Sequence, residues 1–300
     1  MRIDESVLSE WAKGPGTTEA TKCDNAESVV RNAIKANATL SAMDLSVFPQ
    51  GSFRARTNVP RDSDVDICVR HNSVFFGSYP SGLSREDFGN VAADLTYAVF
   101  KNLVGKALTD YLGTGAVTRG NKAFDIHETS YHIDADVVAA FTYRVHGDRS
   151  LLTGQYGVLE GIRFYPDQGS AITNWPQQNY DNGVAKNARC GRHYKRVVRI
   201  LKRLCYQMRS EGIGEAQNVG SFLMECLIWN VPDAGFSNAT YMADLRYALA
   251  YLWNNTRNEA DSSEWKEVND IKFLFAASQP WTLQQAHAFL DAAWNYAGYQ

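Results

Sequence analysis

The segment 51–69 restricts the possible folds of this chain more than any other segment. Gly51 and Ser52 are followed by eleven residues and then by Asp64 and Asp66, which flank a valine and open a run in which apolar and polar residues alternate. Alternation with period two predicts a β-strand, and residues two apart on a strand point to the same face. Asp64 and Asp66 therefore project together, and the apolar residues that alternate with them face a core.

Two carboxylates on one strand face repel each other unless a cation lies between them. Hard oxygen ligands of this kind suit Mg²⁺, and Mn²⁺ can substitute. The pair Asp64 and Asp66 therefore predicts a divalent-cation site. The alternative is a solvent-facing strand edge with two aspartates of no particular function.

Two further features favour the cation site. Glycine lets a backbone approach a phosphate closely, and the Ser52 hydroxyl can bind phosphate oxygens. A second alternating run, 131–141, carries Asp134 and Asp136 among apolar residues. A third carboxylate from this strand would complete a two-metal site for phosphoryl displacement, in which the ions lie about 3.5–4 Å apart. Asp134 and Asp136 share a face, so spacing does not choose between them.

The remaining patterns divide the chain into an α/β first half and a helical second half. In the first half they predict a helix over 24–38, a short strand over 45–48 and a mostly helix-compatible segment over 85–111. The segment 167–191 is rich in Asn, Gln, Gly and Asp and predicts loops at a domain boundary. Helical patterns follow over 193–210, 221–230, 238–254 and 283–297.

Composition excludes several classes of protein. Lys plus Arg number 30 and Asp plus Glu 33, so a net charge of −3 argues against a chain-wide basic surface for nucleic acid. Five scattered cysteines form no C-x-x-C pair, which is typical of reduced thiols in a cytoplasmic protein without a zinc site. Residues 1–10 are too charged for a signal-peptide core, and no apolar run is long enough to span a membrane.

The helix predicted over 193–210 is strongly basic. Lys195, Arg199 and Lys202 stand at i, i+4 and i+7 and form one stripe. A solvated helix face is the ordinary reading of such a stripe. In a net-acidic chain that also carries a metal site, a triphosphate is the more plausible partner.

The motifs GSF, DSDVD and ADVV resemble those of the polymerase-β-like nucleotidyltransferases. In the second half, NWPQQNYDNGVAKN, YKRVVRILKRL and SFLMECLIWNVPD are similar to the bacterial CD-NTases, the cGAS/DncV-like nucleotidyltransferases of CBASS anti-phage systems. The resemblance extends from about Leu8 to Gly298 and is strongest to the clade of cyclic UMP–AMP synthases.

The resemblance implies a fold and a set of site residues. It implies a polymerase-β-like core with a mixed sheet over 1–180, and a C-terminal helical domain over 181–300. Two Mg²⁺ ions would be held by Asp64, Asp66 and Asp136, whereas Asp134 is a lesser candidate. The nucleotide-binding residues would be Gln50, Gly51 and Ser52 at the GS turn, Asn174 as a reader of uracil, and Lys195, Arg199, Lys202 and Ser221 near the triphosphate.

The implied activity is the joining of two nucleoside triphosphates, with UTP and ATP expected, into a cyclic dinucleotide. The protein would act without a template, as a cytoplasmic monomer, and a separate effector would sense the product. Three alternatives remain. They are a template-independent linear polymerase such as a poly(A) or CCA-adding enzyme, a catalytically inactive nucleotide-binding module, and a sensor of double-stranded nucleic acid. The last is disfavoured because no Cys/His cluster suggests a zinc insertion.

Overall fold

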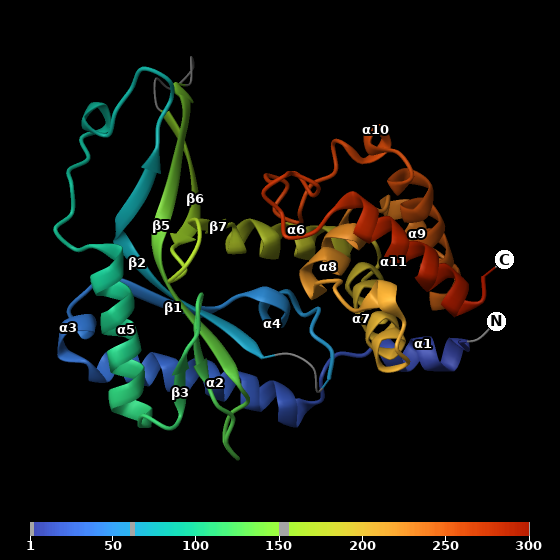
Figure 1. Ribbon diagram of the computed structural model, residues 1–300, viewed down its shortest axis with the longest axis horizontal. Helices are drawn as coiled ribbons and strands as arrows, with labels where there is room; N and C mark the ends of the chain where they lie inside the picture. The colour runs from blue at the N-terminus through green and yellow to red at the C-terminus, as the bar shows by residue number, and fades with distance from the viewer. Residues whose placement is uncertain (1–2, 61–63, 150–155, 300) are drawn as a thin grey trace. The chain divides into compact units, whose positions relative to one another are not determined.

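The computed structural model describes residues 3–60, 64–149 and 156–299, and its chain divides into two compact units. The sheet unit consists of residues 17–53 and 64–176. The helical unit consists of residues 177–300 together with 1–16 and 54–63, so two early segments of the chain belong to it. A mixed α/β fold with a C-terminal helical domain, as predicted, is confirmed (Figure 1).

The sheet unit is built on a mixed sheet of seven strands within the described residues. Their order is β1-β2-β5-β4-β3, and β6 pairs with β5 and β7. Among the described strands, β2 and β5 pair in parallel and the other pairs are antiparallel. The strands are β1 (Leu45–Pro49), β2 (Val65–Ser78), β3 (Val117–Arg119), β4 (Phe124–Ile126), β5 (Ala135–Arg149), β6 (Tyr156–Phe164) and β7 (Ile172–Asn174).

The predicted alternation in β2 is confirmed by its two-sided burial. Val65, Ile67 and Val69 are buried in a core shared with helices α2 (Thr17–Ala36) and α5 (Tyr97–Leu112). Cys68 belongs to a different buried cluster. Because neighbouring strand residues point to opposite faces, Asp66 lies on the Cys68 face, away from the core under α2 and α5.

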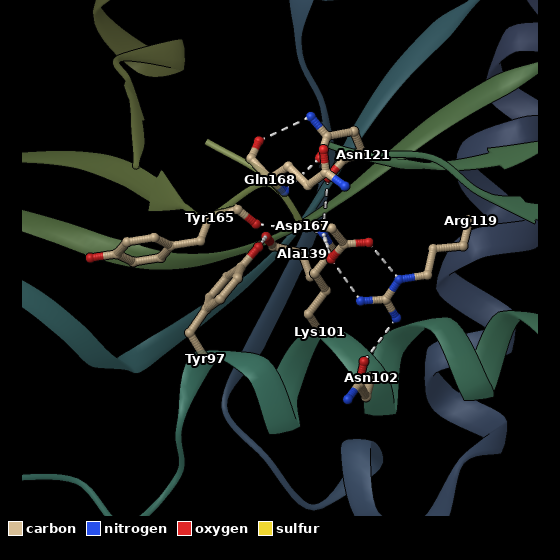
Figure 2. A network of polar contacts seen from close by, with 9 residues as sticks. All are labelled: Tyr97, Lys101, Asn102, Arg119, Asn121, Ala139, Tyr165, Asp167 and Gln168. Carbon is tan, nitrogen blue, oxygen red and sulfur yellow. Dashed lines mark hydrogen bonds and ion pairs between the residues drawn. The ribbon is translucent and has the colours of Figure 1, made fainter. Parts of the chain in front are cut away.

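Along one edge of β5 the pairing strand changes from β4 to β6, and the buried Lys101 side chain bonds the chain segments next to this change. With β2 on one side, β5 pairs on its other side first with β4, at 135–137, and then with β6, from Phe141 onward. Between them, the Tyr97 hydroxyl donates to the Ala139 carbonyl at 3.0 Å. The Lys101 ammonium, 3% exposed, donates to the Asn121 carbonyl at 3.1 Å and to Asp167 Oδ1 at 2.8 Å (Figure 2).

Asp167 completes this network. Arg119 donates to both of its carboxylate oxygens at 2.8 Å, and the guanidinium with the Lys101 ammonium holds the pKa of Asp167 well below its usual range. Lys101 therefore ties the β3–β4 turn and the segment after β6 to α5 (Figure 2). The Ala139 carbonyl, which lies on β5 between its pairings with β4 and β6, is satisfied by the Tyr97 hydroxyl.

The helical unit packs around α7 (Tyr194–Ser210), as its amphipathic pattern predicts. Five apolar positions of that pattern are fully buried, namely Val197, Leu201, Leu204, Cys205 and Met208. Helix α1 (Glu5–Trp11) docks on the start of α9 (Tyr241–Thr256). The Glu5 carboxylate accepts from the amides of Tyr241 and Met242, both at 2.8 Å. The remaining helices of this unit are α6 (Pro176–Arg189), α8 (Ser221–Trp229), α9 (Tyr241–Thr256), α10 (Glu259–Ser262) and α11 (Leu283–Ala297).

The structure differs from the sequence prediction in four places. The helix predicted over 24–38 is α2, which begins earlier, at Thr17, and ends at Ala36, so Asp24 lies inside the helix and does not begin it. Segment 167–191, predicted as loops, contains β7 and the whole of α6. Segment 85–111 is helical only at Glu86–Phe88 and from Tyr97 onward, because Gly89 takes a left-handed φ of 68° and Thr96 caps α5. The strand predicted over 131–141 begins at Ala135, since 129–134 form a turn.

Four short elements complete the list of described elements. They are the helices α3 (Ala38–Ser41) and α4 (Gly51–Ala55), and the 3₁₀ turns Gly214–Ala216 and Asp233–Phe236 in the helical unit. In the part of the chain that the structure describes, no helix combines the length and the apolar character needed to cross a bilayer.

Candidate active site

Three aspartates stand side by side across the sheet. Asp66 on β2 is the register partner of Asp136 on β5, and Asp136 is the partner of Asp125 on β4. Residues directly opposite one another on neighbouring strands point to the same face, about 4.8 Å apart between backbones. The structure therefore forms a carboxylate row of Asp66, Asp136 and Asp125.

Asp125 is absent from the sequence prediction. Its strand has only three residues, Phe124–Ile126, and its two apolar members are buried on either side of the aspartate. The alternation Phe-Asp-Ile is the signal that could have found it, but three residues are too few to distinguish a strand from a loop.

The carboxylate row is electrostatically strained at its centre. Burial raises the pKa of Asp136 to about 7, with further contributions from the negative charges of Asp66, Asp125 and Asp64 and from a hydrogen bond with Asp125. Asp64 immediately precedes β2. At neutral pH a proton or a cation is thus favoured at the centre of the row.

The GS turn packs directly on this row. Gly51 has a φ of 60°, and a Cβ on it would lie 2.0 Å from Asp66 Oδ2, so only glycine fits there. The amide of Gln50 donates to the Asp66 carbonyl at 2.8 Å. Ser52 follows in the first turn of α4. The sequence-distant Gly51 and Asp66 are therefore held in contact within the sheet unit.

The donor chemistry of the row fits a hard divalent cation. Asp66 and Asp136 offer oxygen ligands on adjacent strands, and their mutual repulsion is what such an ion would relieve. In residues 3–60, 64–149 and 156–299 no three His, Cys, Asp or Glu side chains already converge on one metal position. The Asp136 carboxyl instead shares a hydrogen bond with Asp125.

Asn174 lies on the same sheet face as the carboxylate row. Thr142 is six residues after Asp136 on β5, and it pairs with Ile162, which pairs with Asn174. Its neighbour Trp175 is buried and packs on Tyr143, with ring centroids 5.8 Å apart, which makes it a core residue. Of the aromatics near this strand, Trp175 is thus not placed to stack on a base.

The basic stripe on α7 is mostly buried within the helical unit, so the alternative of a solvated helix face is wrong. Lys202 is 1% exposed, with its ammonium 3.6 Å from Glu225 Oε2 and 3.4 Å from Thr57 Oγ1. Arg199 donates to the carbonyls of Ala12 and Arg56, both at 2.7 Å, and burial lowers its pKa to about 10.

Lys195 differs from the other two members of the stripe. It is 8% exposed, and burial lowers the pKa of its ammonium. Within the described residues the group takes part in no hydrogen bond or ion pair, and its neighbour is the Tyr180 ring, 5.9 Å away. Ser221 is the first residue of α8 and is half-buried. Of the stripe, Lys195 is the cation best able to accept an anion.

Replacement of Asp136 should change stability in a pH-dependent way. Because the pKa of Asp136 is raised to about 7, the folded protein holds a proton that the unfolded chain loses above pH 4, so stability falls as pH rises from about 4 to 7. In metal-free buffer at pH 8, Asp136→Asn should be more stable than the parent by about 1–2 kcal/mol, a value reduced for partial exposure.

Urea unfolding at pH 5 and pH 8 measures this difference. At pH 5 the difference between the two proteins should be less than half of that at pH 8, because the folded protein still holds the Asp136 proton there. Added Mg²⁺ should stabilise the parent at pH 8 and leave the variant unchanged. An equal effect of the substitution at both pH values would contradict the assigned electrostatics.

Comparison with known proteins accounts for this arrangement. Residues 181–298 match the family model of the cGAS/DncV-like nucleotidyltransferase C-terminal helical domain. The chain is 42% identical to the cyclic dipyrimidine nucleotide synthase CdnE of Legionella pneumophila, covering 99% of both chains, and 36% identical to that of Cecembia lonarensis, covering 98% of both. The structure of the Rhodothermus marinus CdnE c-UMP-AMP synthase with Apcpp and Upnpp aligns with a TM-score of 0.85 at 31% identity, covering 99% of this chain and 98% of that one.

The relatives match the chain from end to end, and the matched family model covers the helical domain that the structure shows. The resemblance stated from the sequence motifs is confirmed. The chain belongs to the cGAS/DncV-like nucleotidyltransferases, a family of enzymes that includes the CdnE cyclic dinucleotide synthases.

Proposed function

We propose that this enzyme joins two nucleoside triphosphates into a pyrimidine-containing cyclic dinucleotide with the help of Mg²⁺. The observation that carries the proposal is the carboxylate row with the GS turn packed against it. Two relatives of high identity are named as dipyrimidine synthases, and a related c-UMP-AMP synthase binds Apcpp and Upnpp. Uridine is therefore the base we expect first, with UTP and ATP as substrates.

In this proposal Asp64, Asp66 and Asp136 would hold two Mg²⁺ ions. When bound, Mg²⁺ supplies positive charge that acidifies the attacking hydroxyl and stabilises the departing pyrophosphate. Gly51 leaves room for a phosphate at the turn, and Ser52 donates to it. Lys195 binds the triphosphate as a buried cation whose ammonium makes no hydrogen bond or ion pair within the described residues, and Ser221 contributes its hydroxyl at the start of α8.

The reaction is two successive nucleotidyl transfers. A ribose hydroxyl forms a bond to the α-phosphorus of the donor triphosphate, and the bond to the β-phosphate oxygen breaks, which releases pyrophosphate. The hydroxyl proton passes to solvent through the carboxylates. The linear intermediate then turns over, and a second transfer closes the ring. We expect no template, a monomeric enzyme in the cytoplasm, and a product sensed by a separate effector in CBASS anti-phage defence.

The central experiment identifies the product. The protein is incubated with each of the four labelled triphosphates, singly and in pairs, and the product is identified by mass and treated with phosphatase. A phosphatase-resistant product that contains uridine is expected. A phosphatase-sensitive linear product would contradict ring closure, and a product never containing uridine would contradict the role of Asn174.

Substitution of Asn174 should change base choice. The amide offers both a donor and an acceptor, as the uracil edge does, so Asn174→Ala should lower uridine incorporation relative to adenine by about 10- to 100-fold. Competition between labelled UTP and ATP measures the ratio. The matched control is Thr173→Val, because Thr173 is the neighbour on the opposite sheet face. A selectivity change of the same size in this control would contradict direct reading by Asn174.

A further inference from the structure

Asn174 lies at the end of a short strand on the edge of the sheet. Its strand, β7, has three residues and pairs with β6 alone among the described strands. The side-chain amide of Asn174 takes part in no hydrogen bond within the described residues, so no side-chain partner fixes it. The place that this amide can reach is therefore set by the backbone of β7.

The next residue, Trp175, packs against a glycine of β6. The Trp175 side chain is buried, and a Cβ on Gly161 would lie 2.6 Å from Cε3 of the indole and 2.7 Å from the Asn174 carbonyl oxygen. Non-bonded carbon atoms pack at about 3.5–4.0 Å, so a larger residue at position 161 has no space. The missing side chain of Gly161 thus allows the indole and the backbone of Asn174 to lie this close to β6.

The indole has little room to move away from position 161. Tyr143 on β5 is the register partner of Gly161, and its ring centroid lies 5.8 Å from that of Trp175. Paired residues point to the same face, which is the one opposite Thr142 and Asn174. Because both rings are buried, a side chain added at position 161 would displace the indole and the adjoining backbone.

We propose that Gly161 and Trp175 are positioning residues for base selection by Asn174. Packing of the indole on Gly161 fixes the backbone of β7 from one face of the sheet, and the amide on the other face is thereby held where it reads a base. A displaced amide discriminates poorly, because a hydrogen bond weakens steeply with poor geometry. The inference rests on the proposed function, in which Asn174 reads uracil, and all its residues belong to the sheet unit.

The test adds one methyl group at position 161. In competition between labelled UTP and ATP, Gly161→Ala should lower uridine incorporation relative to adenine by about 5- to 20-fold. A general loss of activity would lower both bases alike and leave this base ratio unchanged. The matched control is Gly157→Ala on the same strand, because a Cβ on Gly157 would meet no atom within 4 Å. This control should keep the parental base ratio.

Two further variants separate positioning from general damage. In the Asn174→Ala background, Gly161→Ala should change the base ratio no further, because no amide is left to position. Trp175→Leu removes the indole that lies on Gly161 and should lower the base ratio in the same direction, which keeps the test decisive if Gly161→Ala does not fold. An additive effect in the double variant, or a parental base ratio in either folded single variant, overturns the proposal.

Failure of the proposed function gives a different pattern. If Asn174→Ala leaves the parental base ratio unchanged, the reading of uracil by Asn174 fails. Hydrogen exchange of the β7 backbone amides, measured without nucleotide, then decides whether Gly161 positions this strand. Gly161→Ala should speed exchange there by about tenfold or more, and Gly157→Ala should leave it unchanged. Parental exchange in Gly161→Ala would overturn the positioning role.

Discussion

Asp66→Asn should lower nucleotidyl transfer by about 10³-fold or more. Asp66 is the residue that links the carboxylate row to the GS turn, since it is the register partner of Asp136 and also touches Gly51. An amide at this position keeps the size of the side chain and removes one anionic ligand. Loss of a charged ligand or donor at the reacting phosphorus costs orders of magnitude in rate. Incorporation of α-labelled triphosphate measures the effect.

Asp134→Asn is the matched control for this substitution. Asp134 precedes β5 by one residue, and its Oδ1 accepts the Glu128 amide at 2.7 Å. An asparagine oxygen can accept the same hydrogen bond, so the turn before β5 should be retained and activity should stay within about twofold. Near-parental activity in Asp66→Asn, or an equal loss in Asp134→Asn, would contradict the assignment of the metal ligands.

Lys101→Met should destabilise the sheet unit by about 2–3 kcal/mol. The substitution removes a buried cation that serves the Asn121 carbonyl and Asp167 where β4 and β6 separate along β5. The Asn121 carbonyl then keeps only the Asp167 amide as a donor within the described residues, and the Asp167 carboxylate keeps the Arg119 guanidinium. Removing one partner of a buried polar network costs more than the network itself contributes. Urea unfolding followed by near-UV circular dichroism measures the change.

Lys106→Met provides the comparison on the same helix. Lys106 pairs with Asp110 at 2.7 Å, but both side chains are more than half exposed. An exposed i,i+4 pair contributes about 0.3–0.5 kcal/mol, so this variant should stay within about 0.5 kcal/mol of the parent. Equal destabilisation by both substitutions would show that loss of any lysine from α5 has this effect. The contacts of Lys101 with Asn121 and Asp167 would then not be its cause.

The parts of the fold that the sequence predicted are those with long, regular patterns. The alternation in β2 placed Asp66 opposite the core residues, and the structure confirms this. The amphipathic pattern of α7 and the extent of α11 were likewise predicted. In each case burial of one face is set by the period of the sequence itself, so no knowledge of the partner element is needed.

Elements fixed by distant partners were not predictable in this way. Helix α6 has a polar sequence, and it is stabilised by contacts such as the Lys186 ammonium on the Val231 carbonyl at 2.8 Å. The position of Asp125 beside Asp136 follows only from the register in which β4 pairs with β5. Strand pairing between segments far apart in sequence is information that a local pattern does not contain.

The basic stripe shows the same limit at the candidate site. Spacing placed Lys195, Arg199 and Lys202 on one helix face, which is correct for α7. It did not indicate what covers that face. Arg199 serves two backbone carbonyls and Lys202 faces Glu225, so only Lys195 keeps its ammonium clear of such partners within the described residues. The triphosphate role of each residue stays a prediction.

The interleaving of the chain has a consequence for its synthesis. Helix α1 is among the first segments made, yet Leu8 belongs to a buried cluster with residues that are made much later, such as those of α7 and α9. Closing contacts over such sequence separations slows folding. While a ribosome is still translating residue 180, the helical unit has only its two small early pieces. We expect that a fragment ending there leaves those pieces without their core, and that productive folding waits for release of the finished polypeptide.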